Sequence, residues 1–169
     1  TWKDAGHIGY WWSFMPVKKD PEPFPSEGFV IKTRGDASVD LTKPEAYFYA
    51  KYAIAAGADK LTLKARNFSS ANPTYFGLVA ITEDMTVTPV VPTFTPGEGV
   101  ENNLGEAVNG QIFKFINEDG GQGNPEKYAT FEYDLSAFDG KNVVLALGVV
   151  KGEDSGNEDK LCMYSITLN

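Results

Sequence analysis

The chain has 169 residues, of which 42% are hydrophobic and 13% aromatic, with a net charge of −8 and an isoelectric point near 4.6. This length and composition predict one globular domain, residues 1–169, that can bury a core without disulfides or metals. The acidic balance argues against nucleic acid and against an anionic membrane surface, because there is no basic stripe to neutralise phosphates. No apolar run approaches transmembrane length, so no membrane insertion is expected. A neutral ligand is the expected partner.

The first fourteen residues contain all three tryptophans of the chain, Trp2, Trp11 and Trp12. Residues 8–14 predict a strand in which the adjacent Trp11 and Trp12 face opposite ways, so that one of them points away from the core. That ring either packs beneath a loop or forms a platform for a sugar, whose apolar C–H face lies flat on indole.

Two alternating stretches, Glu45–Ile54 and Asp59–Arg66, each predict a strand with one apolar face. If these strands are hydrogen-bonded neighbours, their outward hydroxyls and cations share one sheet face: Tyr47, Tyr49, Lys51, Lys64 and Arg66. That face is either a solvated surface with ordinary cross-strand pairs or a groove for a polysaccharide.

Small polar residues fill Asn67–Pro73, which predicts a loop, and Thr74–Thr82 predicts the strand that follows. Asn67 and Tyr75 are therefore candidates for recognising sugar hydroxyls. The prolines of Thr86–Pro96 indicate a segment at a sheet edge, and Gly97–Gly110 is interpreted as a long polar insertion.

Further short strands are predicted at Gly28–Thr33, Ala37–Leu41, Gln111–Ile116 and Lys160–Leu168. The final strand contains Cys162, the single cysteine, for which a buried and inert thiol is expected. No stretch has the spacing and caps of an ordinary helix. The coarse count of nine or ten strands predicts an all-β, two-sheet antiparallel sandwich.

The segment Tyr128–Val150 (YATFEYDLSAFDGKNVVLALGVV) contains two apolar runs joined by a short turn. The first run alternates like a half-buried strand, and the second, from Asn142, is rich in valine and leucine like a strand covered on both faces. Between them, Asp139-Gly140 allows a positive φ at glycine. We interpret the segment as a hairpin.

Within it, residues 131–143 (FEYDLSAFDGKNV) resemble a stretch of jelly-roll domains of the galactose-binding-like kind, and residues 160–168 are similar to the last strand of that fold. The resemblance covers about a quarter of the chain. Such domains include carbohydrate-binding modules and accessory domains of secreted bacterial glycosidases. The resemblance implies a jelly-roll sandwich, and the residues that carry it are turn and core residues that do not define a site.

Domains of this resemblance often hold a structural calcium near the chain ends. Calcium needs six to eight oxygen ligands. The chain offers them in the acidic loop before the last strand and in an earlier turn, and the expected ligands are Asp36, Glu153, Asp154 and Asp159. Catalytic residues are not expected, because the single histidine, His7, has no recognisable nucleophile context. The carboxylates cluster in acidic loops, with Glu132 the main exception, and nothing selects a partner for it.

We therefore expect a non-catalytic carbohydrate-binding module, monomeric, from a secreted or surface-attached bacterial protein that also carries a catalytic domain. Aromatic stacking and hydroxyl hydrogen bonds would hold a neutral polysaccharide. The expected binding residues are Trp11, Trp12, Tyr47, Tyr49, Arg66, Asn67 and Tyr75. Two alternatives are a structural spacer or interaction domain of a cell-surface protein, and a small β-sandwich glycosidase or polysaccharide lyase.

Overall fold

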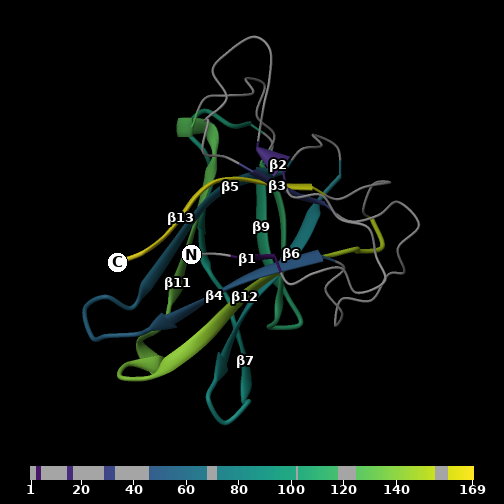
Figure 1. Ribbon diagram of the computed structural model, residues 1–169. Helices are drawn as coiled ribbons and strands as arrows, with labels where there is room; N and C mark the ends of the chain where they lie inside the picture. The colour runs from purple at the N-terminus through teal and green to yellow at the C-terminus, as the bar shows by residue number, and fades with distance from the viewer. Residues whose placement is uncertain are drawn as a thin grey trace.

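The computed structural model describes residues 3–4, 15–16, 29–32, 46–67, 72–101, 103–117, 125–154 and 160–169 (Figure 1). Its strands are β1 (Lys3–Asp4), β2 (Met15–Pro16), β3 (Phe29–Lys32), β4 (Ala46–Ala53), β5 (Lys60–Asn67), β6 (Thr74–Thr82), β7 (Val87–Val90), β8 (Thr93–Thr95), β9 (Asn103–Val108), β10 (Ile112–Asn117), β11 (Ala129–Asp134), β12 (Asn142–Val150) and β13 (Lys160–Leu168). The helices of this part of the chain are two single 3₁₀ turns, η1 (Pro125–Lys127) and η2 (Ser136–Phe138).

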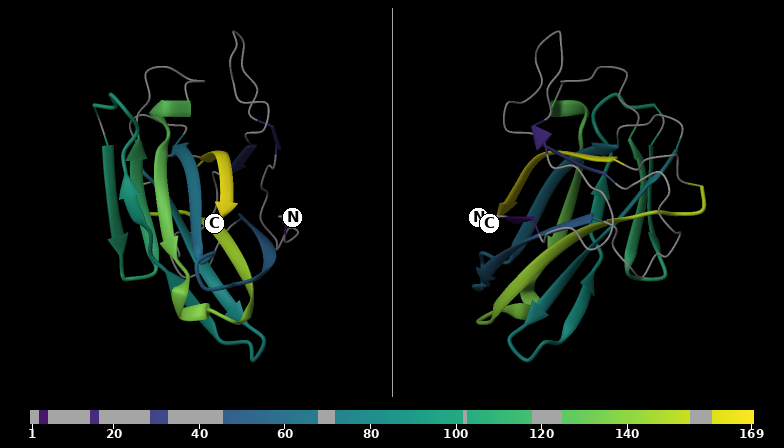
Figure 2. Two further views of the ribbon diagram at one scale, coloured as in Figure 1. Left: turned by 90° about the vertical axis from the view of Figure 1, so that its left-hand side faces the viewer. Right: turned by 45° about the vertical axis from the view of Figure 1, so that its right-hand side comes forward.

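The strands form two antiparallel sheets that pack face to face, as the two layers in Figure 2 show. Sheet A has the order β1-β4-β12-β6-β10-β9, and β7 pairs with the C-terminal half of β6. Sheet B has the order β2-β3-β13-β5-β11-β8. The predicted all-β, two-sheet sandwich is therefore confirmed.

Most connections cross from one sheet to the other, as they do in a jelly roll. The chain passes from β4 in sheet A to β5 in sheet B and back to β6 in sheet A, and β11, β12 and β13 alternate in the same way. The predicted hairpin of β11 and β12 is therefore wrong: η2 carries the chain across the sandwich, and β12 pairs with β4 and β6 instead.

Phenylalanines fill the centre of the core between the two sheets. Phe76 and Phe115 of sheet A meet Phe131 of sheet B with ring centroids 5.0 Å apart and nearly perpendicular planes. This edge-to-face arrangement is the favourable one for aromatic pairs. Leucines and valines from the inward positions of β5, β6 and β12 surround the rings. The alternation of these strands thus fixes which face of each sheet is buried.

Several predicted strands are confirmed, among them Thr74–Thr82 and Lys160–Leu168, whose bounds agree with β6 and β13. The proline-rich segment lies at sheet edges, as β7 and β8. The predicted polar insertion at residues 97–110 is wrong in part, because β9 lies within it. The hydrophobic alternation of β9, from Leu104 to Val108, is weak, and the polar and glycine residues around it obscured this signal in the sequence.

Candidate functional site

The outward positions of the central strands of sheet A are apolar, although they do not face the core. On β12 these positions are Val144, Ala146, Gly148 and Val150, and on β6 they are Gly77, Val79 and Ile81. An antiparallel sheet with one solvated face normally places polar residues there. The outer face of sheet A therefore departs from the ordinary pattern.

Two register rows on this face form what we name the apolar strip. In one row Val144 lies between Lys51 and Ile81, and in the other Ala146 lies between Tyr49 and Val79. Both rows continue onto β7, where they reach Val87 and Pro89. The strip thus consists of Tyr49, Val79, Ile81, Val87, Pro89, Val144 and Ala146.

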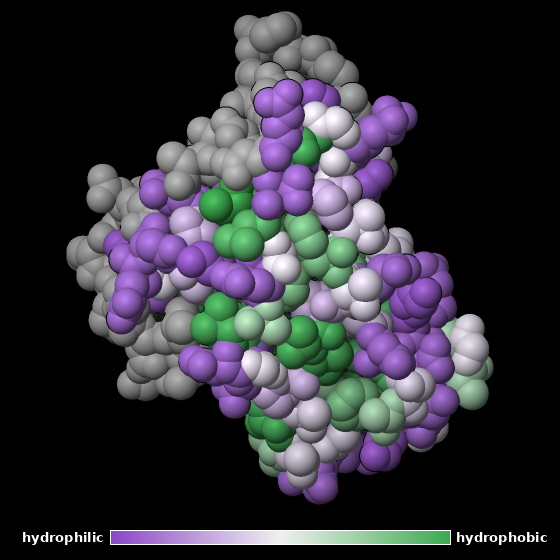
Figure 3. All heavy atoms as spheres, turned by 180° about the vertical axis from the view of Figure 1, so that it is seen from behind, coloured by the Kyte–Doolittle hydropathy of each residue, from purple (hydrophilic) through white to green (hydrophobic). Residues whose placement is uncertain are grey.

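The strip is accessible to solvent. Its residues on β4, β6 and β12 are half-buried, and Val87 is 57% exposed. Met85, Val87 and Val91 are the exposed large hydrophobic residues of the described chain, and all three fall within or beside β7. The view from behind shows another side of the molecule, where hydrophobic residues also reach the surface among hydrophilic ones (Figure 3).

A polar hollow of about 340 Å³ lies at one end of the strip, between the β6–β7 turn and the turn that leads into β12. It is lined by Thr82, Glu83, Asp84, Gly140, Lys141 and Asn142. The Asn142 amide Nδ2 donates to Glu83 Oε1 at 3.0 Å, and the backbone N–H of Thr86 donates to Asp84 Oδ1 at 3.2 Å. These bonds fix the two carboxylates. The hydrogen bonds from Thr82 and Thr86 lower the pKa of Asp84, which is therefore ionised at neutral pH.

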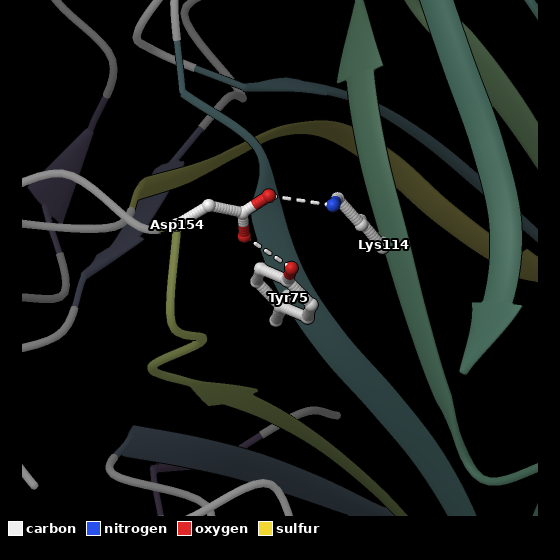
Figure 4. Close-up of polar contacts among 3 residues, drawn as sticks. All are labelled: Tyr75, Lys114 and Asp154. Carbon is white, nitrogen blue, oxygen red and sulfur yellow. Dashed lines mark hydrogen bonds and ion pairs between the residues drawn. The ribbon is translucent and has the colours of Figure 1, made fainter. Parts of the chain in front are cut away.

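Three side chains from three different segments meet at the opposite end of sheet A (Figure 4). Asp154 follows β12. Its carboxylate accepts a hydrogen bond from the Tyr75 hydroxyl of β6 and forms an ion pair with Lys114 Nζ of β10 at 2.6 Å. Lys114 Nζ also lies 5.6 Å from the centroid of the Tyr75 ring. The ring packs on the backbone of Gly152, where a Cβ atom would clash with it. We name Tyr75, Lys114, Gly152 and Asp154 the Asp154 clamp.

The clamp shifts the pKa of each of its three ionisable members, Tyr75, Lys114 and Asp154. Burial alone would raise the pKa of Asp154, but the hydrogen bonds from Lys114 and Tyr75 outweigh it and lower that pKa. The hydrogen bond to Asp154 raises the pKa of Lys114. Burial, together with the bond to Asp154, raises the pKa of Tyr75, so its phenol stays protonated. The cluster is a charge-paired unit that holds residues 151–154 against sheet A.

The predicted sugar-binding residues do not meet in one place. Tyr49 lies on the outer face of sheet A, while Arg66 belongs to sheet B, so the predicted shared face of β4 and β5 is wrong. The reason is that β4 and β5 lie in different sheets instead of pairing as neighbours. Tyr75 is only 6% exposed, because Gly152 and Lys114 cover its ring, and it cannot act as a stacking platform in this structure.

Arg66 was expected to face solvent, but it is 2% exposed, with its guanidinium 5.7 Å from the centroid of the Tyr128 ring. Asn67 is equally buried. Its Oδ1 accepts from the Asn117 backbone N–H at 2.9 Å, and its Nδ2 donates to the Asn72 carbonyl at 3.1 Å. Asn67 therefore fixes the ends of strands β5 and β10, and its amide is not presented at the surface.

The other predicted residues are placed only in part. Trp11, Trp12, Asp36 and Asp159 lie outside the described residues, and for Tyr47 only the backbone is described, in register with Gly148 on β12. Glu153 is exposed. Among the residues that the structure places, no three acidic, histidine or cysteine side chains gather as a metal-binding group. Asp154 is bonded to Lys114 and to Tyr75.

Sequence reasoning missed the hollow and most of the strip. The signal for the strip was present, since the second run of Tyr128–Val150 has no polar residue after Asn142, but we interpreted it as a strand covered on both faces. The hollow had no local signal in the sequence, because its two turns are far apart in the chain. Glu83 and Asn142, which are hydrogen-bonded across the hollow, are separated by 59 positions.

In the described part of the chain, no helix has the length and apolarity to span a bilayer.

A scan against protein-family models found no match, and neither a search of curated proteins nor one of solved structures found any.

Proposed function

We propose that this protein is a non-catalytic glycan-binding module and that the glycan lies on the outer face of sheet A. The observation that carries the proposal is the adjacency of the apolar strip and the polar hollow on one face. Sugar rings combine apolar C–H faces with hydroxyls at their edges. A surface that places a tyrosine and aliphatic groups beside fixed carboxylates, an amide and an ammonium matches that combination.

The chemistry of each part fits a different group of the sugar. Tyr49 and the aliphatic side chains beside it offer apolar area at a low cost in side-chain entropy. In the hollow, the carboxylates of Glu83 and Asp84 accept hydrogen bonds from hydroxyls, and Lys141 donates to hydroxyl oxygens. The two carboxylates are already held by Asn142 and Thr86, so little ordering is needed when a ligand binds.

The net charge of −8 supports a neutral polysaccharide over an acidic one. In the fuller form of the proposal, the module belongs to a secreted or surface-attached bacterial protein and holds a partner catalytic domain near its substrate. A structural calcium in the acidic loop around Glu153 is part of that form. Adding a chelator during the binding assay tests it.

The decisive experiment compares two tyrosines on opposite outer faces. Tyr49 on sheet A and Tyr164 on sheet B are both half-buried. The parent is first screened by affinity electrophoresis and pull-down against soluble and insoluble polysaccharides. For a glycan that the parent retains, Tyr49→Ala is expected to weaken binding on the order of tenfold, equivalent to ~1.4 kcal/mol. Tyr164→Ala is expected to leave binding unchanged.

Equal effects of the two replacements, or an effect of Tyr164→Ala alone, would contradict the proposed face. Trp11→Ala and Trp12→Ala enter the same assay, because a platform in the N-terminal segment remains a prediction. Silence of the folded parent across a broad panel would reject the glycan-binding function itself.

A second candidate function is an interaction or spacer domain, favoured by the exposure of Met85, Val87 and Val91 beside the strip. Here the strip would dock a neighbouring protein domain, as exposed apolar patches often do. A small glycosidase or lyase is the third possibility. Release of reducing sugar by the isolated domain from a retained polysaccharide separates it from both binding functions.

A further inference from the structure

Between the paired residues Val108 and Ile112, the hairpin of β9 and β10 turns through residues 109–111, of which Asn109 and Gly110 come first. Both have positive φ angles, 55° and 65°. The backbone N–H of Gln111 donates to the Val108 carbonyl at 3.3 Å and closes the turn. Asn-Gly with two positive φ angles is the favoured sequence of a type I′ hairpin turn, because glycine has no Cβ penalty and asparagine tolerates this region.

Both turn residues are open to attack. Asn109 and Gly110 are exposed, and apart from Gly110 and its two chain neighbours no residue has an atom within 4 Å of the position that a Cβ of Gly110 would occupy. The backbone nitrogen of Gly110 is therefore not shielded by a side chain of its own or by neighbouring segments. As the backbone nitrogen of the residue that follows Asn109, it closes a five-membered ring when it attacks the side-chain carbonyl carbon of Asn109.

Five other asparagines of the described chain, Asn67, Asn72, Asn103, Asn117 and Asn142, lack this combination. Asn67 and Asn117 are buried, and their side chains hydrogen-bond to backbone groups. Asn72 precedes a proline, whose nitrogen carries no hydrogen and cannot attack.

Asn103 and Asn142 are exposed but differ from Asn109 in two respects. Their Nδ2 groups donate to the Val100 carbonyl and to Glu83, and bulky residues follow them in the chain. In the full sequence, Asn109-Gly110 is the one Asn-Gly pair.

We infer that Asn109 is a site of spontaneous deamidation. The Gly110 backbone nitrogen attacks Cγ of Asn109 and loses its proton, and the side-chain amide leaves as ammonia, giving a five-membered succinimide. Water then opens this ring at either carbonyl. The products are aspartate, or isoaspartate in which the backbone runs through the former side chain. No oxidant or cofactor is needed.

The reaction changes the hairpin as well as its charge. Each product adds one negative charge to a chain that already carries −8. Isoaspartate also inserts one backbone atom into a tight turn whose register sets Val108 opposite Ile112. Because turn geometry fixes register in a hairpin, the isoaspartyl form is expected to loosen β9, the edge strand of sheet A.

The test uses the folded full chain in mildly alkaline buffer, with time points analysed by anion exchange and peptide mapping. Asn109 is expected to convert faster than Asn103 and Asn142, on the order of tenfold or more, equivalent to a barrier lower by ~1.4 kcal/mol. The variant Asn109→Gly keeps a residue suited to positive φ and removes the reacting amide. It is expected to fold and to form no acidic species at this hairpin. Equal conversion at Asn103 or Asn142, or an Asn109 that stays intact while they react, would overturn the inference.

Discussion

The two sheets share one core, but their outer faces differ in polarity. On sheet B the outward, half-buried positions of the central strands are polar: Thr62 and Lys64 on β5, and Thr130 and Glu132 on β11. On sheet A the equivalent positions are Val79, Ile81, Val144 and Ala146. A sandwich needs only its inner faces to be apolar. Burial between the two sheets does not require the outer face of sheet A to be apolar, and the proposed function attributes this apolarity to binding.

The most direct test of whether the two outer faces differ in function places the same positive charge on each of them. Ala146→Arg puts a long cationic side chain in the middle of the apolar strip, and Thr62→Arg puts it at the centre of sheet B. If the strip binds the ligand, Ala146→Arg weakens binding by more than about tenfold, or ~1.4 kcal/mol, since the arginine covers apolar area and must lose water. Titration calorimetry with a retained glycan measures this effect.

Thr62→Arg is the matched control, because Thr62 also lies at a half-buried outward position of a central strand. It is expected to bind like the parent. Thermal unfolding of both variants checks that neither has lost its fold. Comparable losses of affinity in the two variants would show that the outer faces do not differ in function.

A smaller effect is expected at the Asp154 clamp, which closes one end of sheet A. Asp154→Asn removes the ion pair to Lys114, and because Asp154 is half exposed, we expect a loss of stability below about 1 kcal/mol. The folded pKa of Asp154 is lowered, so this stabilisation is present above about pH 4 and is lost as pH falls through the folded pKa. The raised pKa of Lys114 means that it is also lost as pH rises through that pKa, above about 10.

Urea unfolding of parent and Asp154→Asn across this pH range measures the difference. The two curves are expected to be separated near neutral pH and to converge in acid. A difference that persists at the lowest pH where both proteins fold would mean that packing, and not the ion pair, carries the contribution of Asp154.

The smallest effect is expected on sheet B, at the exposed pair Lys60 and Glu132, whose Nζ and Oε1 atoms are 3.3 Å apart. A double-mutant cycle with alanine is expected to give a coupling of about 0.5 kcal/mol or less, because water and salt screen such pairs. A much larger coupling would show that the polar face of sheet B is also energetically organised.

Sequence alternation determined most elements and their buried faces. β6 and β13 have the predicted bounds, and the inward positions of β4 and β5 were assigned correctly except at the end of β5, where Arg66 is buried too. A period of two is a local property, visible in any single strand. The turn at Asp139-Gly140 was equally readable, and Gly140 has the positive φ expected of it.

The tertiary structure alone decided which strands pair. Strands adjacent in sequence are often neighbours in a sheet, and on that basis β4 with β5 and β11 with β12 were expected to pair. Here the chain crosses the sandwich at both places, so each strand finds partners far away in sequence. The strip, the hollow and the clamp all depend on those distant pairings. Alternation therefore fixes the two faces of a strand, but the identity of the neighbours that turn a face into a site is a property of the whole fold.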